Sequence, residues 1–426
     1  MGETREDKIG ILVGGGPAPG INGVIHSATI EGINNGFDIV GIYDGFQHLI
    51  EGEMVSTSLT INDVSRIHLT GGSILRTARA NPTIAVERLR NCVRALIDAG
   101  IGYLVAVGGD DTAYSAYRVA RYAQEEMGVT IQTVHVPKTI DNDLPLPEEL
   151  RTFGFETARE VGTKIVRNLM EDALTGQRWF LVVTMGRKAG HLALGIGKSS
   201  GATVTLIPEE WSGREIRLQE VTDILITSVL KRMASGKKYG LALVAEGVVE
   251  QLAMQDLAGL EHAERDAHGH IRLSEVNFSD VLKKSVRTGL AGLGLDVRIV
   301  SKDVGYELRC ADPIAFDIDY TRSLGEAAVD FLINGGTHAT VTIQRNQVVP
   351  MPFAEMMDPE TGRTEVRQVD LDSFTYQSAY KFMIRLNPQD ADDEMLWARM
   401  AAYTSVSPEE LKEQFGYLVG IAPRPF

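Results

Sequence analysis

Acidic residues follow two short β-branched runs that are predicted as strands, at a spacing that suits phosphoryl chemistry. The segment GGDDT (108–112) follows the run 103–107, and PKTIDND (137–143) follows the run 131–136. Mg²⁺ prefers one or two carboxylates together with substrate phosphates, and an aspartate in such a loop can act as a general base. The alternatives are helix capping by Asp110 or Asp111 and an Asx-turn in the second loop.

A glycine-rich segment, GGGPAPGIN (14–22), follows the first apolar run, 9–13. Such a turn brings backbone N–H groups and a helix N-terminus toward one point, as phosphate binding requires. The segment matches neither GxGxxG nor the Walker A pattern. Taken alone, it is explained equally well as a tight turn between a strand and a helix.

Cations and other polar side chains follow later runs of the same kind. MGRKAGH (185–191) follows 179–184, Glu246 follows 239–245, and Tyr306 and Arg309 come later in the chain. Arginine grips phosphate through its planar guanidinium fork. A surface salt bridge would explain each cation singly, but together they outline a phosphosugar site.

Strands and helices that would position these residues alternate through the first half of the chain. Strands are predicted at 9–13, 39–43, 103–107, 131–136, 179–184, 202–207 and 239–245, and helices up to about 34–36 and at 83–99, 111–127 and 155–174. The alternation predicts an α/β fold with two similar layers, each a mostly parallel sheet with helices on both faces. Ligands of such sheets bind beyond the carboxyl ends of the strands.

Composition narrows the class of protein. The 426 residues carry 42 Lys and Arg against 57 Asp and Glu, a net charge of −15, which disfavours nucleic acid as a partner. No apolar run approaches the roughly 18 residues that a membrane span needs. The only two cysteines, Cys92 and Cys310, lack the CxxC spacing and suggest a reducing compartment. We therefore expect a soluble cytoplasmic protein with no membrane partner.

Seven segments occur in the order and roughly the spacing of the phosphofructokinase family. They are GGGPAPGIN, GGSILRTAR, GGDDT, PKTIDND, MGRKAGH, VAEG and GYELRCADP. The sequence resembles this family from about Ile9 to about Arg345, and PxTIDND followed by MGR is close to diagnostic. The resemblance implies an active site in the cleft between the two α/β layers.

The resemblance also implies a division of the chain. A larger α/β domain at about 1–150 would carry the pyrophosphate and Mg²⁺ site. A second α/β domain at about 151–345 would carry the sugar-phosphate site, with an insertion near 251–277. Residues 346–426 would form a C-terminal extension that packs back on the body.

Asp111 and Lys138 stand where ATP-dependent members typically have glycine, which matches the pyrophosphate-dependent branch. Asp111 would place a side chain and a negative charge where the α-phosphate of ATP must lie. Lys138 would neutralise the leaving phosphate. The resemblance thus implies reversible transfer from pyrophosphate to the 1-hydroxyl of fructose 6-phosphate, giving fructose 1,6-bisphosphate and phosphate, in glycolysis and gluconeogenesis.

Individual roles follow from the same resemblance. Asp141 matches the catalytic base and Asp110 the Mg²⁺ position, with Asp143 as a supporting carboxylate. Gly15 matches a backbone contact to pyrophosphate, and Arg79 matches an arginine near the transferring phosphates.

The phosphosugar contacts form a second set. The matching residues are Thr139, which would lie between donor and sugar, and Met185, Gly186, Arg187, Glu246, Tyr306 and Arg309. Arg178 matches a cation that family members supply across a subunit interface, which implies a homodimer or homotetramer.

Other functions remain open at this point. One alternative is an ATP-dependent 6-phosphofructokinase, and another is a non-catalytic regulatory subunit that binds sugar phosphates. Asp110, Asp141 and Asp143 are all present, which favours catalysis. Sedoheptulose 7-phosphate would offer the same phosphate and a similar ketose end. A histidine metal site is a further, weaker alternative, formed by His262, His268 and His270.

Overall fold

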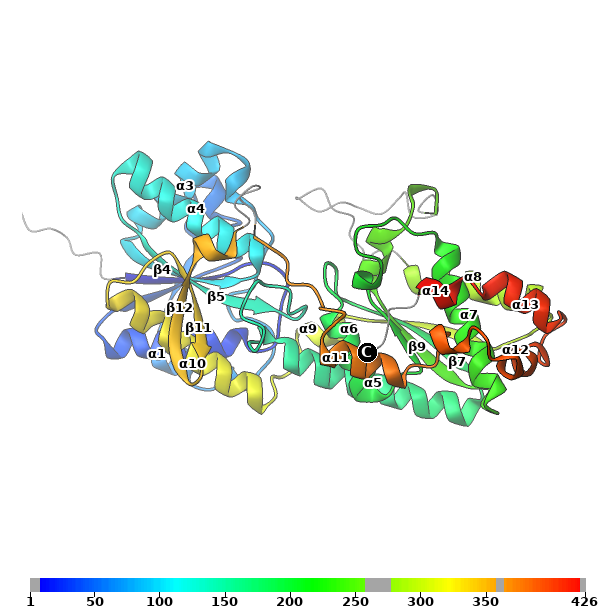
Figure 1. Ribbon diagram of the computed structural model, residues 1–426. Coiled ribbons are helices and arrows are strands. Elements are labelled where there is room, and N and C mark those ends of the chain that lie inside the picture. Colours follow the sequence, from blue (N-terminus) through cyan, green and yellow to red (C-terminus); the bar gives the residue numbers. More distant parts are fainter. Residues whose placement is uncertain (1–7, 257–276, 358–363, 422–426) are drawn as a thin grey trace, which may run out of the picture. The chain divides into compact units, whose positions relative to one another are not determined.

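The computed structural model describes residues 8–256, 277–357 and 364–421 (Figure 1). The expected insertion near 251–277 and the three histidines within it lie almost entirely outside these ranges. The chain forms two compact units, one from Met1–Ala158 with Tyr306–Arg367, the other from Arg159–Gly305 with Gln368–Phe426. The division into a donor domain (1–150), a sugar-phosphate domain (151–345) and a C-terminal extension (346–426) stays a prediction.

A mainly parallel eight-stranded sheet forms the centre of the first unit. Its order is β12-β11-β5-β4-β1-β2-β3, with β6 beside β5. The strands are β1 Lys8–Val13, β2 Asp38–Ile42, β3 Ser56–Leu59, β4 Ile101–Gly108, β5 Gln132–Thr139, β6 Phe153–Gly154, β11 Ala339–Gln344 and β12 Gln347–Pro352. Only the edge strands β3 and β12 pair antiparallel with their neighbours.

Helices cover both faces of this sheet. They are α1 Ile21–Asn34, α2 Ile61–Val64, α3 Val86–Asp98, α4 Asp110–Met127, α9 Tyr306–Arg309 and α10 Ala315–Ile333. Successive side chains of a strand point to opposite faces, so Ile9 and Ile11 of β1 pack with α1 and α10, while Leu12 packs with α3 and α4. Figure 1 shows these two helix pairs on opposite sides of the sheet.

The second unit contains a parallel four-stranded sheet of order β10-β7-β9-β8. The strands are β7 Trp179–Thr184, β8 Val204–Leu206, β9 Gly240–Ala245 and β10 Ile299–Val304. The helices are α6 His191–Ser200, α7 Leu218–Ala234, α8 Phe278–Gly292, α11 Phe374–Phe382, α12 Glu394–Ala401, α13 Pro408–Phe415 and α14 Leu418–Ile421. Helix α5, Phe155–Gly176, contains the boundary between the units.

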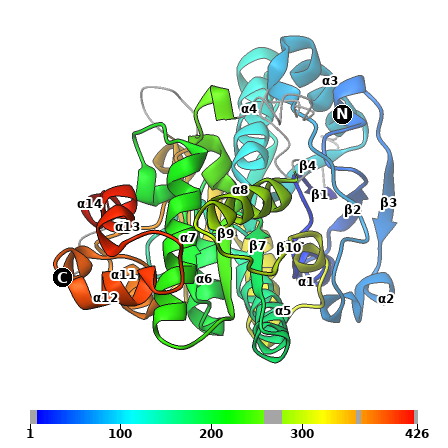
Figure 2. The ribbon, with the colours of Figure 1, turned by 90° about the vertical axis from the view of Figure 1, so that its right-hand side faces the viewer.

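Both faces of this second sheet are covered as well. Trp179 and Leu181 of β7 belong to the core with α7, α8 and α12, whereas Ala245 of β9 packs with α6 and α11. Figure 2 shows α7 and α8 beside the strands β7, β9 and β10. The predicted fold class is therefore confirmed: two mostly parallel sheets, each with helices on both faces. No helix in the described ranges combines the length and the hydropathy needed to cross a lipid bilayer.

Candidate functional site

The glycine turn after β1 is tied to two other segments of the first unit. The N–H of Gly14 donates to the carbonyl of Val107 at 2.9 Å, which fixes the turn to the end of β4. The N–H of Gly15 donates to the carbonyl of Ala78 at 3.0 Å, and Thr77 Oγ1 donates to the carbonyl of Gly15 at 2.6 Å. Gly15, expected to contact pyrophosphate, therefore uses both of its backbone polar groups within the protein.

Three cationic side chains surround this turn. A Cβ placed on Gly15 would lie 3.3 Å from Lys138 Nζ, and one placed on Gly16 would lie 3.6 Å from Arg309 Cζ and 3.7 Å from Arg79 Nη2. Lys138 Nζ also donates to the carbonyl of Gly16. Because these two glycines have no side chains, the backbone there can be approached by a ligand beside three cations. Such a site suits an anion with several charged oxygens.

The lowered pKa of Lys138 also indicates an anion-binding site. Its side chain is 4% exposed. Burial lowers the pKa of Lys138 to about 8, and the nearby Arg309 and Arg79 lower it as well, whereas Asp141 and Asp143 oppose the shift. A bound anion would offset the repulsion among the three cations, so the cluster is electrostatically prepared for one.

The predicted acidic residues lie at the ends of neighbouring strands. β4 and β5 are parallel neighbours, with Gly108 opposite Pro137. Asp110 and Asp111 stand in the first turn of α4, where the helix dipole favours negative charge. The N-cap residue of α4 is Gly109, so neither aspartate occupies the N-cap position itself.

The loop after β5 carries the other two aspartates. The N–H of Asp141 donates to Thr139 Oγ1 at 3.0 Å, and Asn142 adopts a positive φ of 56°. Asp141 and Asp143 both act electrostatically on Lys138. The first unit thus brings the predicted residues Gly15, Arg79, Lys138, Thr139, Asp141 and Arg309 to one edge of its sheet, beside Asp110 and Asp111.

A metal ion at this edge needs ligands from the substrate. Within residues 8–256, 277–357 and 364–421, no group of three or more His, Cys, Asp or Glu side chains is arranged to hold a metal ion. Mg²⁺ is commonly bound by one or two carboxylates and completes its shell with substrate phosphates and water. The carboxylates at the ends of β4 and β5 fit that mode of binding.

His135 is a buried residue that connects β5 to the end of β4 and to β11. The sequence analysis did not identify it. Its ring is fully buried on β5, where Nε2 donates to the carbonyl of Gly108 at 2.8 Å and Nδ1 lies 3.0 Å from Thr340 Oγ1. Burial lowers the pKa of His135 to about 4, so the ring is neutral at neutral pH. A histidine inside an apolar strand was the available signal.

The second unit brings together most of the predicted phosphosugar residues. The N–H of Gly186 faces Glu246 Oε1 at 3.4 Å, and the N–H of Gly247 donates to the carbonyl of Gly186 at 3.1 Å. Arg187 Nε donates to Glu250 Oε1 at 3.0 Å. Since β7 and β9 are parallel neighbours, the segments 185–187 and 246–250 meet at one edge of this sheet.

Three predicted phosphosugar residues, Thr139, Tyr306 and Arg309, lie in the first unit. Arg309 Cζ lies 5.1 Å from the ring centroid of Tyr306, a cation–π contact, and the Tyr306 side chain is 63% exposed. Arg309 therefore lies with the glycine turn and Lys138, in the group expected to bind the donor.

Arg178 lies at the other end of β7 from the predicted phosphosugar residues of its own unit. It precedes the first residue of β7, whereas Met185 follows the last residue, so the length of the strand separates the two. Its Nε forms an ion pair with Asp172 at 3.3 Å. Within its own unit, Arg178 is not brought to the edge that carries Met185 and Arg187.

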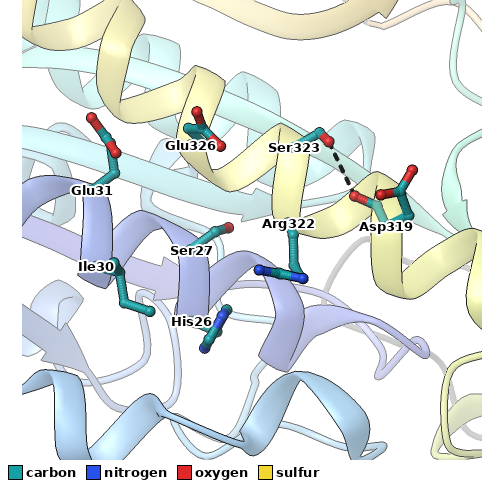
Figure 3. A pocket seen from close by; sticks show the side chains of 8 residues that line it. All are labelled: His26, Ser27, Ile30, Glu31, Asp319, Arg322, Ser323 and Glu326. Atoms are coloured by element: carbon teal, nitrogen blue, oxygen red, sulfur yellow. Dashed lines mark hydrogen bonds between the residues drawn. The ribbon is translucent and has the colours of Figure 1, made fainter.

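The first unit also has a hollow between two of its helices. It has a volume of about 310 Å³ between α1 and α10 and contains none of the predicted site residues. Figure 3 shows His26 and Arg322 lining it, together with the acidic Glu31, Asp319 and Glu326. The mixed charges select no particular ligand, so we assign it no function.

Comparisons with known proteins agree with this arrangement. The family model described as phosphofructokinase matches residues 8–332. The chain is 49% identical to a pyrophosphate–fructose 6-phosphate 1-phosphotransferase of Thermotoga maritima, over 96% of this chain and 98% of that protein. It is 48% identical to a protein of the same name from Naegleria fowleri, over 96% and 95% of the two chains.

A solved structure supports the same fold. The crystal structure of a pyrophosphate-dependent phosphofructokinase from Nitrosospira multiformis superposes with a TM-score of 0.67 at 18% sequence identity. The match covers 94% of this chain and 92% of that one.

Proposed function

Since the chain belongs to the phosphofructokinase family, we propose that it phosphorylates fructose 6-phosphate at the 1-hydroxyl, reversibly and with pyrophosphate as donor. The products are fructose 1,6-bisphosphate and phosphate. The observation that carries the proposal is the cluster of Lys138, Arg79 and Arg309 around Gly15 and Gly16, beside the carboxylates of β4 and β5.

The proposed roles at the donor follow from charge and position. Lys138 and Arg79 hold the pyrophosphate oxygens, and Lys138 stabilises the charge that develops on the leaving phosphate. Asp141 accepts the proton of the sugar hydroxyl. Asp110 would hold Mg²⁺ together with phosphate oxygens, and that ion would neutralise charge on the pyrophosphate. Asp111, which is exposed in the first turn of α4, disfavours the longer nucleotide donor.

The sugar phosphate is assigned to the remaining predicted residues. Glu246 would accept hydrogen bonds from sugar hydroxyls, with Met185, Gly186 and Arg187 at the same sheet edge. Tyr306 and Arg309 would bind the 6-phosphate, with Thr139 between donor and sugar. For Arg178, we propose a role across a subunit interface in a homodimer or homotetramer. Both cysteines are free thiols, which supports a reducing, cytoplasmic location.

A donor comparison tests this function. With purified protein, Mg²⁺ and fructose 6-phosphate, we expect turnover with pyrophosphate and none with ATP at the same concentration. Fructose 1,6-bisphosphate and phosphate should drive the reverse reaction. Turnover with ATP alone would identify an ATP-dependent enzyme, and no turnover with either donor would favour the regulatory alternative. Sedoheptulose 7-phosphate in place of fructose 6-phosphate tests the acceptor.

The pKa of Lys138 predicts how donor binding depends on pH. Lys138 carries its proton below a pKa of about 8, and only the charged form attracts the anion. Above that pH the ratio of neutral to charged lysine grows about tenfold per pH unit. We therefore expect KM for pyrophosphate to rise as pH increases through about 8, measured by initial rates between pH 6.5 and 9.5 (roughly one to two units on either side of that pKa).

Pyrophosphate itself titrates in this range, so the matched control is Lys138→Arg. Arginine stays charged throughout, and this variant should show a flatter KM profile even if its activity is lower. Identical profiles for the two proteins would contradict the assignment of Lys138 to the donor.

A further inference from the structure

The loop that carries Asp141 and Asp143 has little regular structure of its own. Residues 140–152 lie between β5 and β6 and contain neither helix nor strand. Its two ends are joined by the Asn142 side chain, whose Oδ1 accepts from the N–H of Thr152 at 3.1 Å, and by Thr152 Oγ1, which donates to the carbonyl of Thr139 at 2.8 Å. The N–H groups of Leu146 and Leu150 donate to the carbonyls of Leu144 and Pro147, and other carbonyls of the loop need donors from elsewhere.

One side chain from a distant segment supplies several of these donors. Arg367 Nη1 donates to the carbonyls of Leu146 at 3.2 Å, Pro147 at 3.2 Å and Leu150 at 3.0 Å. Its Nε and Nη2 donate to the carbonyl of Asn142 at 3.1 and 3.0 Å, and Nη2 also donates to Asn142 Oδ1 at 2.5 Å. The N–H of Arg367 donates to the carbonyl of Asp143 at 2.8 Å.

These contacts hold the backbone on the C-terminal side of Asp141. Asn142 and Asp143 are bound directly, and the same guanidinium reaches the far end of the loop at Leu150. We propose that Arg367 is a positioning residue that fixes the loop 140–152, and with it the carboxylates of Asp141 and Asp143, for phosphoryl transfer. The inference rests on the proposed function, because it assumes that Asp141 is the base.

Only a guanidinium can form this set of bonds. Arginine offers five N–H donors in a rigid planar fork, whereas lysine concentrates three donors on one atom. Burial lowers the pKa of Arg367 to about 10, and the positive charge of Arg151 lowers it too, so the group remains charged at neutral pH. Loss of its side chain would take this donor from the carbonyls of Asn142 and Leu146, whereas the carbonyl of Pro147 would keep the N–H of Leu150.

The variants Arg367→Met, Arg367→Lys and Arg367→Ala test the proposal in the full chain. A misplacement of about 1 Å at a reacting group can cost about 10²-fold in rate. We therefore expect Arg367→Met to lower kcat by about that factor, while KM for fructose 6-phosphate and pyrophosphate changes less than about threefold. Arg367→Lys should retain more activity than Arg367→Met, and added guanidinium should restore part of the kcat of Arg367→Ala.

An activity-independent readout separates this proposal from the proposed function. Hydrogen exchange without substrate should show faster exchange of the amides in 140–152 in Arg367→Met, with β4 and β5 unchanged. The control is Arg121→Met, which removes an exposed guanidinium on α4 that pairs with Glu125. Inactivity of the unsubstituted protein with both donors would count against the proposed function, whereas the exchange result would still stand.

Three outcomes would overturn the role of Arg367. The first is full kcat in Arg367→Met, and the second is unchanged exchange in the loop. The third is loss of folding in all three variants, which would assign Arg367 to the stability of its unit.

Discussion

Asp141→Asn is expected to lower kcat for fructose 6-phosphate phosphorylation by about 10²–10⁴-fold, the range that general-base catalysis contributes. The amide cannot accept the proton of the 1-hydroxyl. It has nearly the shape of the carboxylate, and the N–H of residue 141 can still donate to Thr139 Oγ1. KM for both substrates should therefore change little, because the loss falls on the transition state.

Steady-state kinetics in both directions measure this effect. Asp98→Asn is the matched control, since Asp98 is an exposed carboxylate in the last turn of α3 in the same unit, and it should leave kcat unchanged. A loss of less than about tenfold in Asp141→Asn would mean that another group takes the proton.

The second large effect concerns the donor. Lys138→Gly removes one of three cations around the glycine turn and the bond from Nζ to the carbonyl of Gly16. We expect kcat/KM for pyrophosphate to fall by about 10²–10³-fold, the cost of losing one preorganised donor at a developing charge. Adding Asp111→Gly removes a side chain and a negative charge from the first turn of α4. Relative use of ATP should then rise.

Lys138→Met separates charge from space in this experiment. Methionine removes the charge but keeps much of the volume, so this variant should lose pyrophosphate activity without gaining ATP activity. Retention of the original pyrophosphate kcat/KM in the Asp111→Gly, Lys138→Gly double variant would overturn the two-residue explanation of donor choice.

Many of the strands could be predicted from the sequence, because parallel strands that are buried on both faces tend to be continuous apolar runs. The segment 179–184 was predicted as a strand and is β7, and the prediction 103–107 lies within β4. The residues that follow these strands were located for the same reason, because the carboxyl edge of a parallel sheet collects them.

The secondary structure of the later part of the chain was harder to predict from the sequence. β11 and β12 form a hairpin whose turn residues, Arg345 and Asn346, have positive φ values of 50° and 60°. Hairpin turns of that conformation usually contain Asn-Gly or Asp-Gly. The Arg345-Asn346 pair does not match this pattern, so the sequence did not predict a hairpin here. No strand was predicted beyond residue 245, where the structure has β10, β11 and β12.

Residues that act through tertiary contacts were missed for a different reason. Arg367 lies in a polar segment without a motif, and its bonds to the loop 140–152 join residues more than 200 positions apart.

The first unit is built from two segments of the chain, with most of the second unit between them in the sequence. This order affects how the unit can fold during synthesis. β5 takes β11 as its parallel neighbour, and His135 of β5 meets Thr340 of β11 across 205 positions of sequence. While the ribosome is still translating the second unit, β5 therefore has an edge whose backbone N–H and C=O groups are largely unpaired, a state prone to association with other chains. We infer that a nascent chain stalled before residue 339 depends on chaperones more than the finished protein does.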